Sequence, residues 1–323
     1  MQVIDTSQAP VWLKGRTRVL IFRTVAILAC GMGAAILLRG FGRVSADRVS
    51  MDNVLHVSVA GRDVALWKPG GAAPANGYPV VVFSHGYTGC NTQSAFLMQA
   101  LARAGYLVVA PNHKDAGCGT AWRPGKLLAE RPQEPFRDAA EWSDATYKDR
   151  DADIESVLDA VLDEPSFQGV PIDRERVGIA GHSLGGYTVL GLAGGWPSWK
   201  DGRISAVLAL SPHCSPYIAQ GDLRHLNVPV MYQGGTLDLG ETPVVKRAGG
   251  AYDLSSAPKY FVEFEGAGHL AWTDLNKRYQ EVIDAYSVAF FDRYLKMTAP
   301  DPLVGLMGNP PPKGVSSVRV DLK

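Results

Sequence analysis

The chain reads Val177-Gly178-Ile179-Ala180-Gly181-His182-Ser183-Leu184-Gly185-Gly186 between a strand-like apolar run and a helical pattern. Glycines two residues before and after Ser183 permit a strand-to-helix turn that is too tight for a Cβ. Such a turn, a nucleophile elbow, holds a serine hydroxyl exposed at its tip. Because Leu184 would begin the helix, its amide lacks an intrahelical partner and is available to an oxyanion. Gly-x-Ser-x-Gly alone is a weak pattern among 35 glycines, so the flanking strand, helix and Gly186 carry the prediction.

The remaining apolar runs predict a sheet of buried strands with helices between them. Continuous apolar runs are typical of strands that are buried on both faces, and here they occupy residues 80–83, 106–110, 204–210, 228–233 and 259–264. Helical periodicity covers residues 92–104 and 149–162, follows the elbow, and returns at 273–295. Residues 54–60 and 63–68 alternate and predict an N-terminal antiparallel hairpin. We therefore expect a mostly parallel sheet covered by helices on both faces.

The N-terminal segment 1–46 predicts an export signal or an N-terminal membrane anchor. It carries six basic residues and one acidic residue around an apolar run from Thr24 to Leu38. This run of 15 residues is shorter than the roughly 20 that span a bilayer, which favours a cleaved signal. A run counted from Val19 is long enough but includes Arg23, so membrane association through residues 19–38 stays an alternative. Either reading predicts an exported protein, periplasmic or secreted.

The body of the chain has an ordinary globular composition and a mildly acidic balance, which gives no reason to expect a nucleic-acid partner. No cysteine or histidine spacing suggests a metal site. An exported protein can form disulfides, and Cys90–Cys118 is the pair to test, although buried free thiols are nearly as plausible.

Two segments fall outside the strand–helix rhythm of the predicted domain, residues 47–298. Residues 116–147 are rich in proline and aromatic residues and predict an insertion over the sheet edge, a lid or a pocket wall. The C-terminal tail, residues 299–323, is proline-rich and then weakly strand-like. We expect the tail to pack outside the core or to fray.

Ligands of parallel α/β sheets bind beyond the carboxyl ends of the strands. Those ends carry His85-Gly86-Tyr87, Ser183, Asp238 and His269. Serine, aspartate and histidine follow one another at intervals of 55 and 31 residues, so each can come from a different strand end.

These residues resemble the serine α/β-hydrolases. The chain is similar to the dienelactone-hydrolase-like group, the bacterial cutinase-like polyester hydrolases and the platelet-activating-factor acetylhydrolases. The resemblance spans residues 54–296 through the segments 83–88, 181–186, 234–238 and 266–269. Two features differ: dienelactone hydrolases use a cysteine where this chain has Ser183, and segment 116–147 exceeds a minimal cutinase-like core.

Acyl transfer assigns a role to each residue. Ser183 is the expected nucleophile, His269 its base and later the acid, and Asp238 the group that orients the imidazole. Leu184 N–H is one oxyanion donor, and the resemblance implies Tyr87 N–H as the other. Pocket-lining roles are expected for His182, Trp122 and Trp272. The reaction requires no metal and no organic cofactor.

Rival residues exist for two of these roles. His113 also follows a strand end and is the rival base, whereas Asp253 and Asp274 are rival acids. His269 and Asp238 are favoured because the fold places its histidine last and its acid at a strand end.

The sequence therefore predicts an α/β-hydrolase that cleaves carboxylic esters, small-molecule or lipid-like, through an acyl-enzyme. An amidase or acyl-peptidase on the same fold is the alternative within the class. A catalytically inactive binding protein is the alternative from another class. The sequence predicts no oligomeric state.

Overall fold

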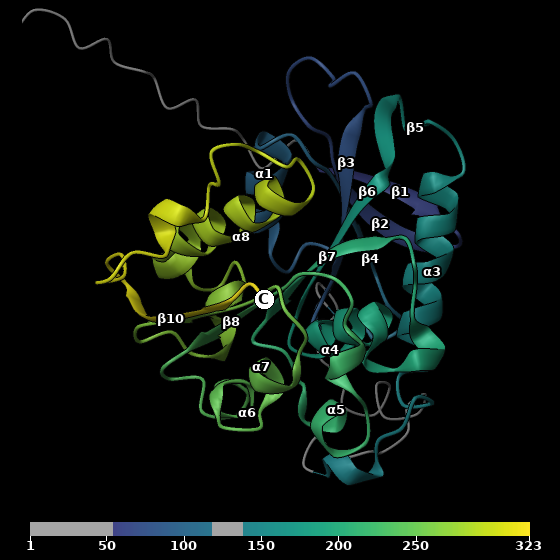
Figure 1. Cartoon of the computed structure of the whole chain (residues 1–323). Helices are drawn as coiled ribbons and strands as arrows, with labels where there is room; N and C mark the ends of the chain where they lie inside the picture. Colours follow the sequence, from purple (N-terminus) through teal and green to yellow (C-terminus); the bar gives the residue numbers. More distant parts are fainter. Residues whose placement is uncertain (1–53, 118–137) are drawn as a thin grey trace, which may run out of the picture. The chain divides into compact units, whose positions relative to one another are not determined.

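A ten-stranded, mostly parallel sheet forms the centre of the computed structural model, which describes residues 54–117 and 138–323 (Figure 1). The main path runs β1-β2-β4-β3-β6-β7-β8-β9-β10, and β5 pairs only with β6. The strands are β1 Val54–Val59, β2 Arg62–Trp67, β3 Tyr78–Ser84, β4 Leu107–Pro111, β5 Ser166–Phe167, β6 Val170–His182, β7 Ile204–Leu210, β8 Val230–Gly235, β9 Lys259–Phe264 and β10 Val315–Asp321. Strands β4, β3, β6, β7, β8 and β9 pair in parallel, so their carboxyl ends meet at one edge.

Helices cover both faces of the sheet, as the sequence predicts. The longer ones are α1 Ala95–Arg103, α3 Lys148–Leu162, α4 Leu184–Leu190 and α8 Gln280–Tyr294. Shorter ones are α5 Ser215–Ala219, α6 Thr242–Lys246 and α7 Ala251–Leu254. Helices α1 and α8 pack on one face, and α3 and α4 on the other (Figure 1). Helix α8 begins seven residues later than the periodicity predicted, because 269–272 and 277–279 form separate 3₁₀ turns.

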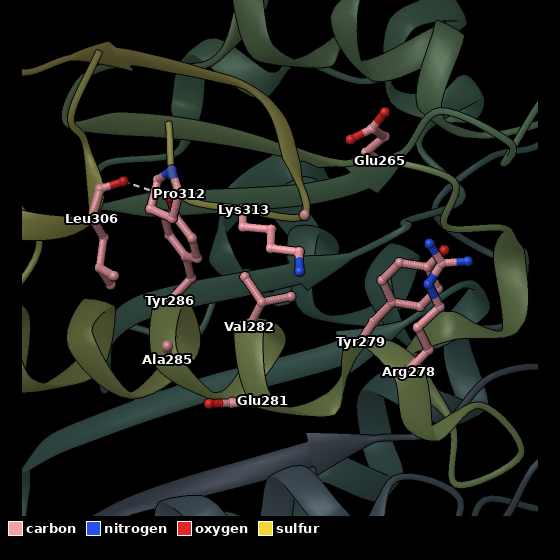
Figure 2. A pocket seen from close by; sticks show the side chains of 11 residues that line it. Glu265, Arg278, Tyr279, Glu281, Val282, Ala285, Tyr286, Leu306, Pro312 and Lys313 are labelled. Carbon is pink, nitrogen blue, oxygen red and sulfur yellow. Dashed lines mark hydrogen bonds between the residues drawn. The ribbon is translucent and has the colours of Figure 1, made fainter. Parts of the chain in front are cut away.

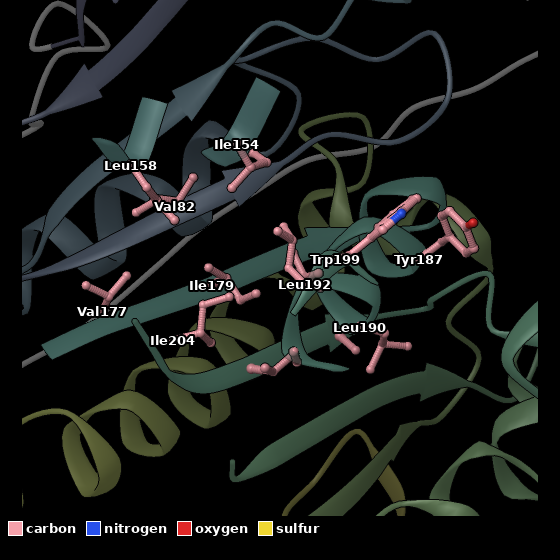
Figure 3. Packing of buried hydrophobic residues seen from close by; sticks show 14 of the residues in the cluster. Val82, Ile154, Leu158, Val177, Ile179, Tyr187, Leu190, Leu192, Trp199 and Ile204 are labelled. Carbon is pink, nitrogen blue, oxygen red and sulfur yellow. The ribbon is translucent and has the colours of Figure 1, made fainter. Parts of the chain in front are cut away.

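Two hydrophobic clusters, one on each face, hold these layers together. In β3, Val80 and Val82 face the α3/α4 side, whereas Val81 and Phe83 face the α1/α8 side, and all four are buried. Figure 3 shows part of the α3/α4 cluster, where Ile154 lies close to the side chains of the sheet. A strand buried on both faces explains why its sequence is apolar without alternation.

The two ends of the sheet are antiparallel. The predicted hairpin is confirmed as β1 and β2, with Val54 opposite Trp67 and Val59 opposite Arg62. At the other end, β10 pairs antiparallel with β9, so the tail does not lie outside the core as the sequence suggested. Leu303 is fully buried in the α1/α8 cluster. The sequence signal of β10 is weak because most side chains of this edge strand are exposed or only partly buried, so the strand lacks the continuous apolar run of a central strand.

Several predictions fall on residues outside this description. The leader 1–46, most of the insertion 116–147, and Trp122 belong to this group, so the signal and the lid stay predictions. Cys90 is disulfide-bonded and Cys214 is a buried free thiol. The partner of Cys90 is not among the described residues, so the Cys90–Cys118 pairing also stays a prediction. Among residues 54–117 and 138–323, no helix combines the length and the apolarity that a membrane span requires.

Candidate active site

Ser183 occupies a strained turn between β6 and α4. Its φ of 56° and ψ of −116° lie in a region that non-glycine residues rarely adopt. The neighbouring glycines are required sterically: a Cβ at Gly181 would overlap the Gly185 carbonyl, and a Cβ at Gly185 would overlap the Ser84 carbonyl. The turn is held further by Ser183 N–H, which donates to Leu210 O at 3.0 Å, and by the Ser183 carbonyl, which accepts from His213 N at 3.0 Å. The elbow predicted from sequence therefore has the expected geometry.

Ser183, His269 and Asp238 meet at the carboxyl edge of the sheet. His269 Nε2 lies 2.9 Å from Ser183 Oγ, and His269 Nδ1 lies 3.3 Å from Asp238 Oδ1. Asp238 is buried, whereas the His269 side chain is 38% exposed, so the base is open to a substrate. The contact with Asp238 fixes the proton on Nδ1 and leaves Nε2 to accept the serine proton.

The surroundings favour a protonated histidine beside an ionised aspartate. Burial lowers the pKa of His269, but the hydrogen bond to Asp238, the charge of Asp238 and that of Glu241 raise it above 6.5 overall. Burial raises the pKa of Asp238, but hydrogen bonds from His269 and Ser211 bring it below 3.8. The pair can therefore hold the imidazolium that forms when the base takes a proton.

Ser211 adds a hydroxyl that the sequence did not reveal. It is fully buried, adopts a φ of 43°, donates to Asp238 Oδ2, and lies 2.9 Å from His269 Nδ1. Since Nδ1 carries the proton, Ser211 Oγ accepts from the imidazole while it donates to the carboxylate. The unusual backbone at the end of β7 places the hydroxyl between the two side chains.

A chain of hydrogen bonds joins the elbow to the loops on either side. Gln93 Oε1 accepts from Gly86 N at 3.0 Å, and Gln93 Nε2 lies 3.0 Å from His182 Nδ1. His182 Nε2 in turn lies 2.8 Å from His269 O and donates to it. Burial, and then the charge of His269, lower the pKa of His182 to about 3, so His182 is neutral and keeps this tautomer.

Residues 81–312 match the alpha/beta hydrolase family. The chain belongs to this family. Among individual proteins, the chain is 27% identical to Cutinase est1 of Thermobifida alba over 244 residues, 72% of this chain and 69% of that protein. It is 27% identical to Cutinase 2 of Thermobifida cellulosilytica over 243 residues, 72% of this chain and 77% of that protein. A platelet-activating factor acetylhydrolase of Cavia porcellus is 25% identical over 175 residues, 47% of this chain and 38% of that protein.

The structure contains a second serine–histidine–aspartate contact, which includes His113, the rival base. His113 Nε2 lies 2.8 Å from Ser84 Oγ, and His113 Nδ1 lies 3.1 Å from Asp153 Oδ2. This pairing repeats the connectivity of a catalytic pair, but all three residues are at most 2% exposed. A substrate carbonyl has no surface from which to approach Ser84. Solvent access therefore favours Ser183 as the nucleophile.

The two rival acids have structural partners elsewhere. Asp253 lies in α7, where Arg319 Nη2 is 2.6 Å from its carboxylate. Asp274 accepts from the backbone amides of Ala95 and Phe96, both at 3.0 Å, and so caps the start of α1. Asp274 was expected inside the final helix, but it precedes that helix and docks α1 onto the loop that carries His269.

The structure does not support the predicted pocket roles of His182 and Trp272. His182 is 3% exposed and uses both ring nitrogens for bracing. Trp272 is fully buried, and its Nε1 donates to Gln233 Oε1 at 3.0 Å. His182 directly precedes Ser183, and Trp272 lies three residues after His269. This closeness in sequence to two site residues is the reason that a pocket wall was predicted. His213 is also buried, at 3% exposed: its Nδ1 lies 3.0 Å from Glu241 Oε1 and its ring 4.9 Å from that of Trp142.

A cavity of about 750 Å³ lies between α8 and the segment that follows it (Figure 2). Its lining mixes charged, aromatic and aliphatic residues: Glu265, Arg278, Tyr279, Glu281, Val282, Ala285, Tyr286, Leu306, Pro312, Lys313 and Gly314. Ser183, Asp238 and His269 are not among them, so this cavity is separate from the candidate active site.

Arg150 is the buried residue that the sequence analysis missed most clearly. It lies in α3, is fully buried, and pairs with Asp115 at 2.7 Å. The sequence did contain a sign of this burial: Arg150 precedes Ile154 by four residues, which places the cation on the apolar face of the helix.

In the described residues, no group of three or more histidine, cysteine, aspartate or glutamate side chains could hold a metal ion.

Proposed function

We propose that the protein is a serine hydrolase that cleaves carboxylic esters through an acyl-enzyme on Ser183. The observation that carries the proposal is the 2.9 Å contact between Ser183 Oγ and His269 Nε2, with Asp238 behind the imidazole. Family membership supports the hydrolase class, and the cutinases and the acetylhydrolase among its relatives support an ester bond as the target.

The chemistry follows from the positions of the three side chains. Ser183 Oγ adds to the ester carbonyl carbon as its proton passes to His269 Nε2, and the carbonyl oxygen becomes an oxyanion. The N–H groups of Leu184 and Tyr87 are the proposed donors to that oxygen. His269 then protonates the leaving alkoxide, and a water molecule, deprotonated by His269, releases the acid.

The surroundings of the site support an apolar, uncharged ester. Five exposed large apolar side chains lie on the loops that follow β3, β8 and β9: Tyr87, Leu237, Leu239, Leu270 and Leu275. The same loops carry three of the candidate site residues, Tyr87, Asp238 and His269, which supports an apolar approach to the site. Burial of an acyl chain there gains roughly 0.8 kcal/mol for each methylene.

Labelling with a serine-directed fluorophosphonate tests the proposal directly. The wild type and the Ser84→Ala variant should label, whereas Ser183→Ala should not. Hydrolysis of p-nitrophenyl esters should fall by at least three orders of magnitude in Ser183→Ala. Loss of labelling in Ser84→Ala alone would identify Ser84 as the nucleophile instead of Ser183. Absence of labelling in the wild type and both variants would favour a binding protein.

A comparison of matched substrates separates ester hydrolysis from amide hydrolysis. We expect p-nitrophenyl esters to be turned over and the corresponding p-nitroanilides to resist, because an amine leaves only after full protonation. Comparable kcat/KM on both series would instead indicate an amidase or acyl-peptidase.

Export also belongs to the proposal. The basic flank and apolar run of residues 1–46 support it, as does the disulfide at Cys90, since disulfides persist mainly in oxidising compartments. Cell fractionation, with N-terminal sequencing of the recovered protein, tests it. Recovery from the cytoplasm with an intact N-terminus would contradict it.

A further inference from the structure

A buried cation lies against the loop that precedes Tyr87. Arg150 Nη1 donates to His85 O at 2.7 Å, and Nη2 donates to Gly86 O at 3.2 Å. Nη2 also donates to Asp115 Oδ2 at 2.7 Å, and both members of this ion pair have fully buried side chains. Two successive carbonyl oxygens therefore converge on one guanidinium group, and the loop curls around Arg150.

The positions of the two carbonyls set the directions of the two following amides. In a planar trans peptide, the C=O and the next N–H point to opposite sides. For the first peptide this opposition is visible: His85 O meets Arg150, while Gly86 N–H donates to Gln93 Oε1 at 3.0 Å. In the second peptide, the contact of Gly86 O with Arg150 directs the Tyr87 N–H away from the cation.

Three donors converge on the carbonyl of this second peptide. Besides Arg150 Nη2, Gly86 O accepts from His85 Nδ1 at 2.7 Å and from Gly89 N at 3.0 Å. A carbonyl that accepts charge-assisted hydrogen bonds becomes more polarised, and its peptide N–H becomes a stronger donor. The same contacts that orient the Tyr87 amide thus also strengthen it.

The buried serine–histidine contact belongs to the same scaffold. Ser84 Oγ lies 3.5 Å from Arg150 Nη1 and 2.8 Å from His113 Nε2. His113 N–H donates to His85 Nε2 at 3.0 Å, so the His85 ring keeps its proton on Nδ1, toward Gly86 O. The buried Ser84–His113 contact therefore braces the loop that precedes Tyr87, a structural role that needs no access to solvent.

We propose that Arg150 is a positioning residue for the oxyanion hole, acting through the Gly86–Tyr87 peptide. This inference rests on the proposed function, because the Tyr87 N–H is taken to stabilise the oxyanion formed when Ser183 Oγ adds to the ester carbonyl. Arg150 touches neither substrate nor Ser183; it fixes the peptide whose N–H meets the negative charge.

The test compares Arg150→Met with Arg62→Met. Arg62 Nη2 lies 2.5 Å from Oδ1 of the buried Asp153, and the Arg62 side chain is itself 26% exposed, so each variant removes one cation that pairs with a buried carboxylate. Among the described hydrogen bonds, none joins Arg62 to the carbonyls of His85 or Gly86, which makes it a matched control. Each variant is assayed well below its own melting temperature on a p-nitrophenyl ester and with a trifluoromethyl ketone. The serine hemiketal of this ketone places its oxyanion in the hole.

Arg150→Met should lower kcat about 100-fold with little change in KM. It should lower the affinity for the ketone by a similar factor, as expected for a displaced oxyanion donor. Arg62→Met should change kcat and the ketone affinity by less than about threefold each, although its melting temperature falls. Arg150→Lys retains the charge but lacks the planar guanidinium that can donate to two carbonyls at once. It should recover part of the lost kcat and ketone affinity.

Equal kinetics in Arg150→Met and Arg62→Met, or a fall in kcat with ketone affinity intact, would overturn the inference. If Arg150→Met does not fold, Arg150→Lys decides, because wild-type kcat and ketone affinity there would also overturn it. Activity retained by Ser183→Ala would instead refute the proposed function, so the two failures are distinguishable.

Discussion

At the scale of single residues, the site depends on two serines with left-handed backbones. Ser183 has φ 56° and Ser211 has φ 43°, and each follows the end of a parallel strand. Such conformations cost about 1–3 kcal/mol each and persist only where the surrounding structure imposes them. Here the strain places one hydroxyl before the imidazole and the other behind it.

The pH dependence of activity follows from His269. Its imidazole must be neutral to accept the serine proton, so activity falls as pH drops through its pKa. Because the net effect of its surroundings raises that pKa, the acidic limb of kcat/KM should be centred above 6.5. In Asp238→Asn the midpoint should move down and kcat should fall by about four orders of magnitude. A wild-type midpoint at or below 6.5 would contradict the charge arrangement.

Replacement of Ser211 tests the hydroxyl behind the imidazole. Ser211→Ala removes a donor to the Asp238 carboxylate, and hydrogen bonds to charged groups contribute about 1.5–3 kcal/mol. We expect kcat to fall roughly tenfold to a hundredfold, and the acidic limb to shift, measured with p-nitrophenyl esters. The control is Ser205→Ala, because Ser205 lies in β7, the strand that precedes Ser211, and its hydroxyl donates to Glu175 O; this variant should keep wild-type kinetics. Identical pH profiles for both variants would show that Ser211 is not coupled to the base.

At the scale of elements, the β6–elbow–α4 unit works because glycine permits three backbones to approach one another. A Cβ at Gly185 would overlap the carbonyl oxygens of Ser84 and His85, and a Cβ at Gly186 would overlap Pro212. These neighbours are mostly backbone atoms, which cannot rotate away. The elbow glycines therefore determine how close β3 and β7 lie to the nucleophile.

Gly185→Ala should destabilise the protein by about 3 kcal/mol or more, at or beyond the upper end for an overpacked site, and should abolish ester hydrolysis. Urea denaturation measures the first effect and turnover the second. Gly202→Ala is the control, because its added Cβ would meet no atom within 4 Å. Its free energy of unfolding should change by less than about 1 kcal/mol. Equal stability of the two variants would contradict the packing described for the elbow.

At the scale of the whole molecule, the C-terminal tail completes the sheet and the core. Strand β10 covers the edge of β9, which would otherwise present unpaired backbone groups. Leu303 is fully buried, whereas the adjacent Val304 is 67% exposed. The tail is therefore part of the folded domain.

Leu303→Ala should lower the free energy of unfolding by about 2–5 kcal/mol, the range for a buried leucine. Val304→Ala should change it by less than about 0.5 kcal/mol. Chemical denaturation of both variants makes the comparison, and a small effect of Leu303→Ala would show that the tail is only loosely attached.

Local residue patterns were enough to predict the layers of the fold and to propose Ser183, Asp238 and His269 as candidate site residues. Apolar runs identify strands buried on both faces, and the glycines around Ser183 identify the elbow, because both are local consequences of burial and sterics. Asp238 and His269 followed from strand-end positions and chain order.

Which polar residues meet across long sequence separations became clear only from the folded chain. Ser211, Gln93 and Arg150 carry no local motif, since their roles arise from hydrogen bonds to residues 27 to 89 positions away. Tertiary packing likewise showed that Trp272 and His182 are interior residues, and that His113 is part of a buried brace. Burial and partner identity depend on how the strands are ordered in the sheet, and local residue patterns do not contain that order.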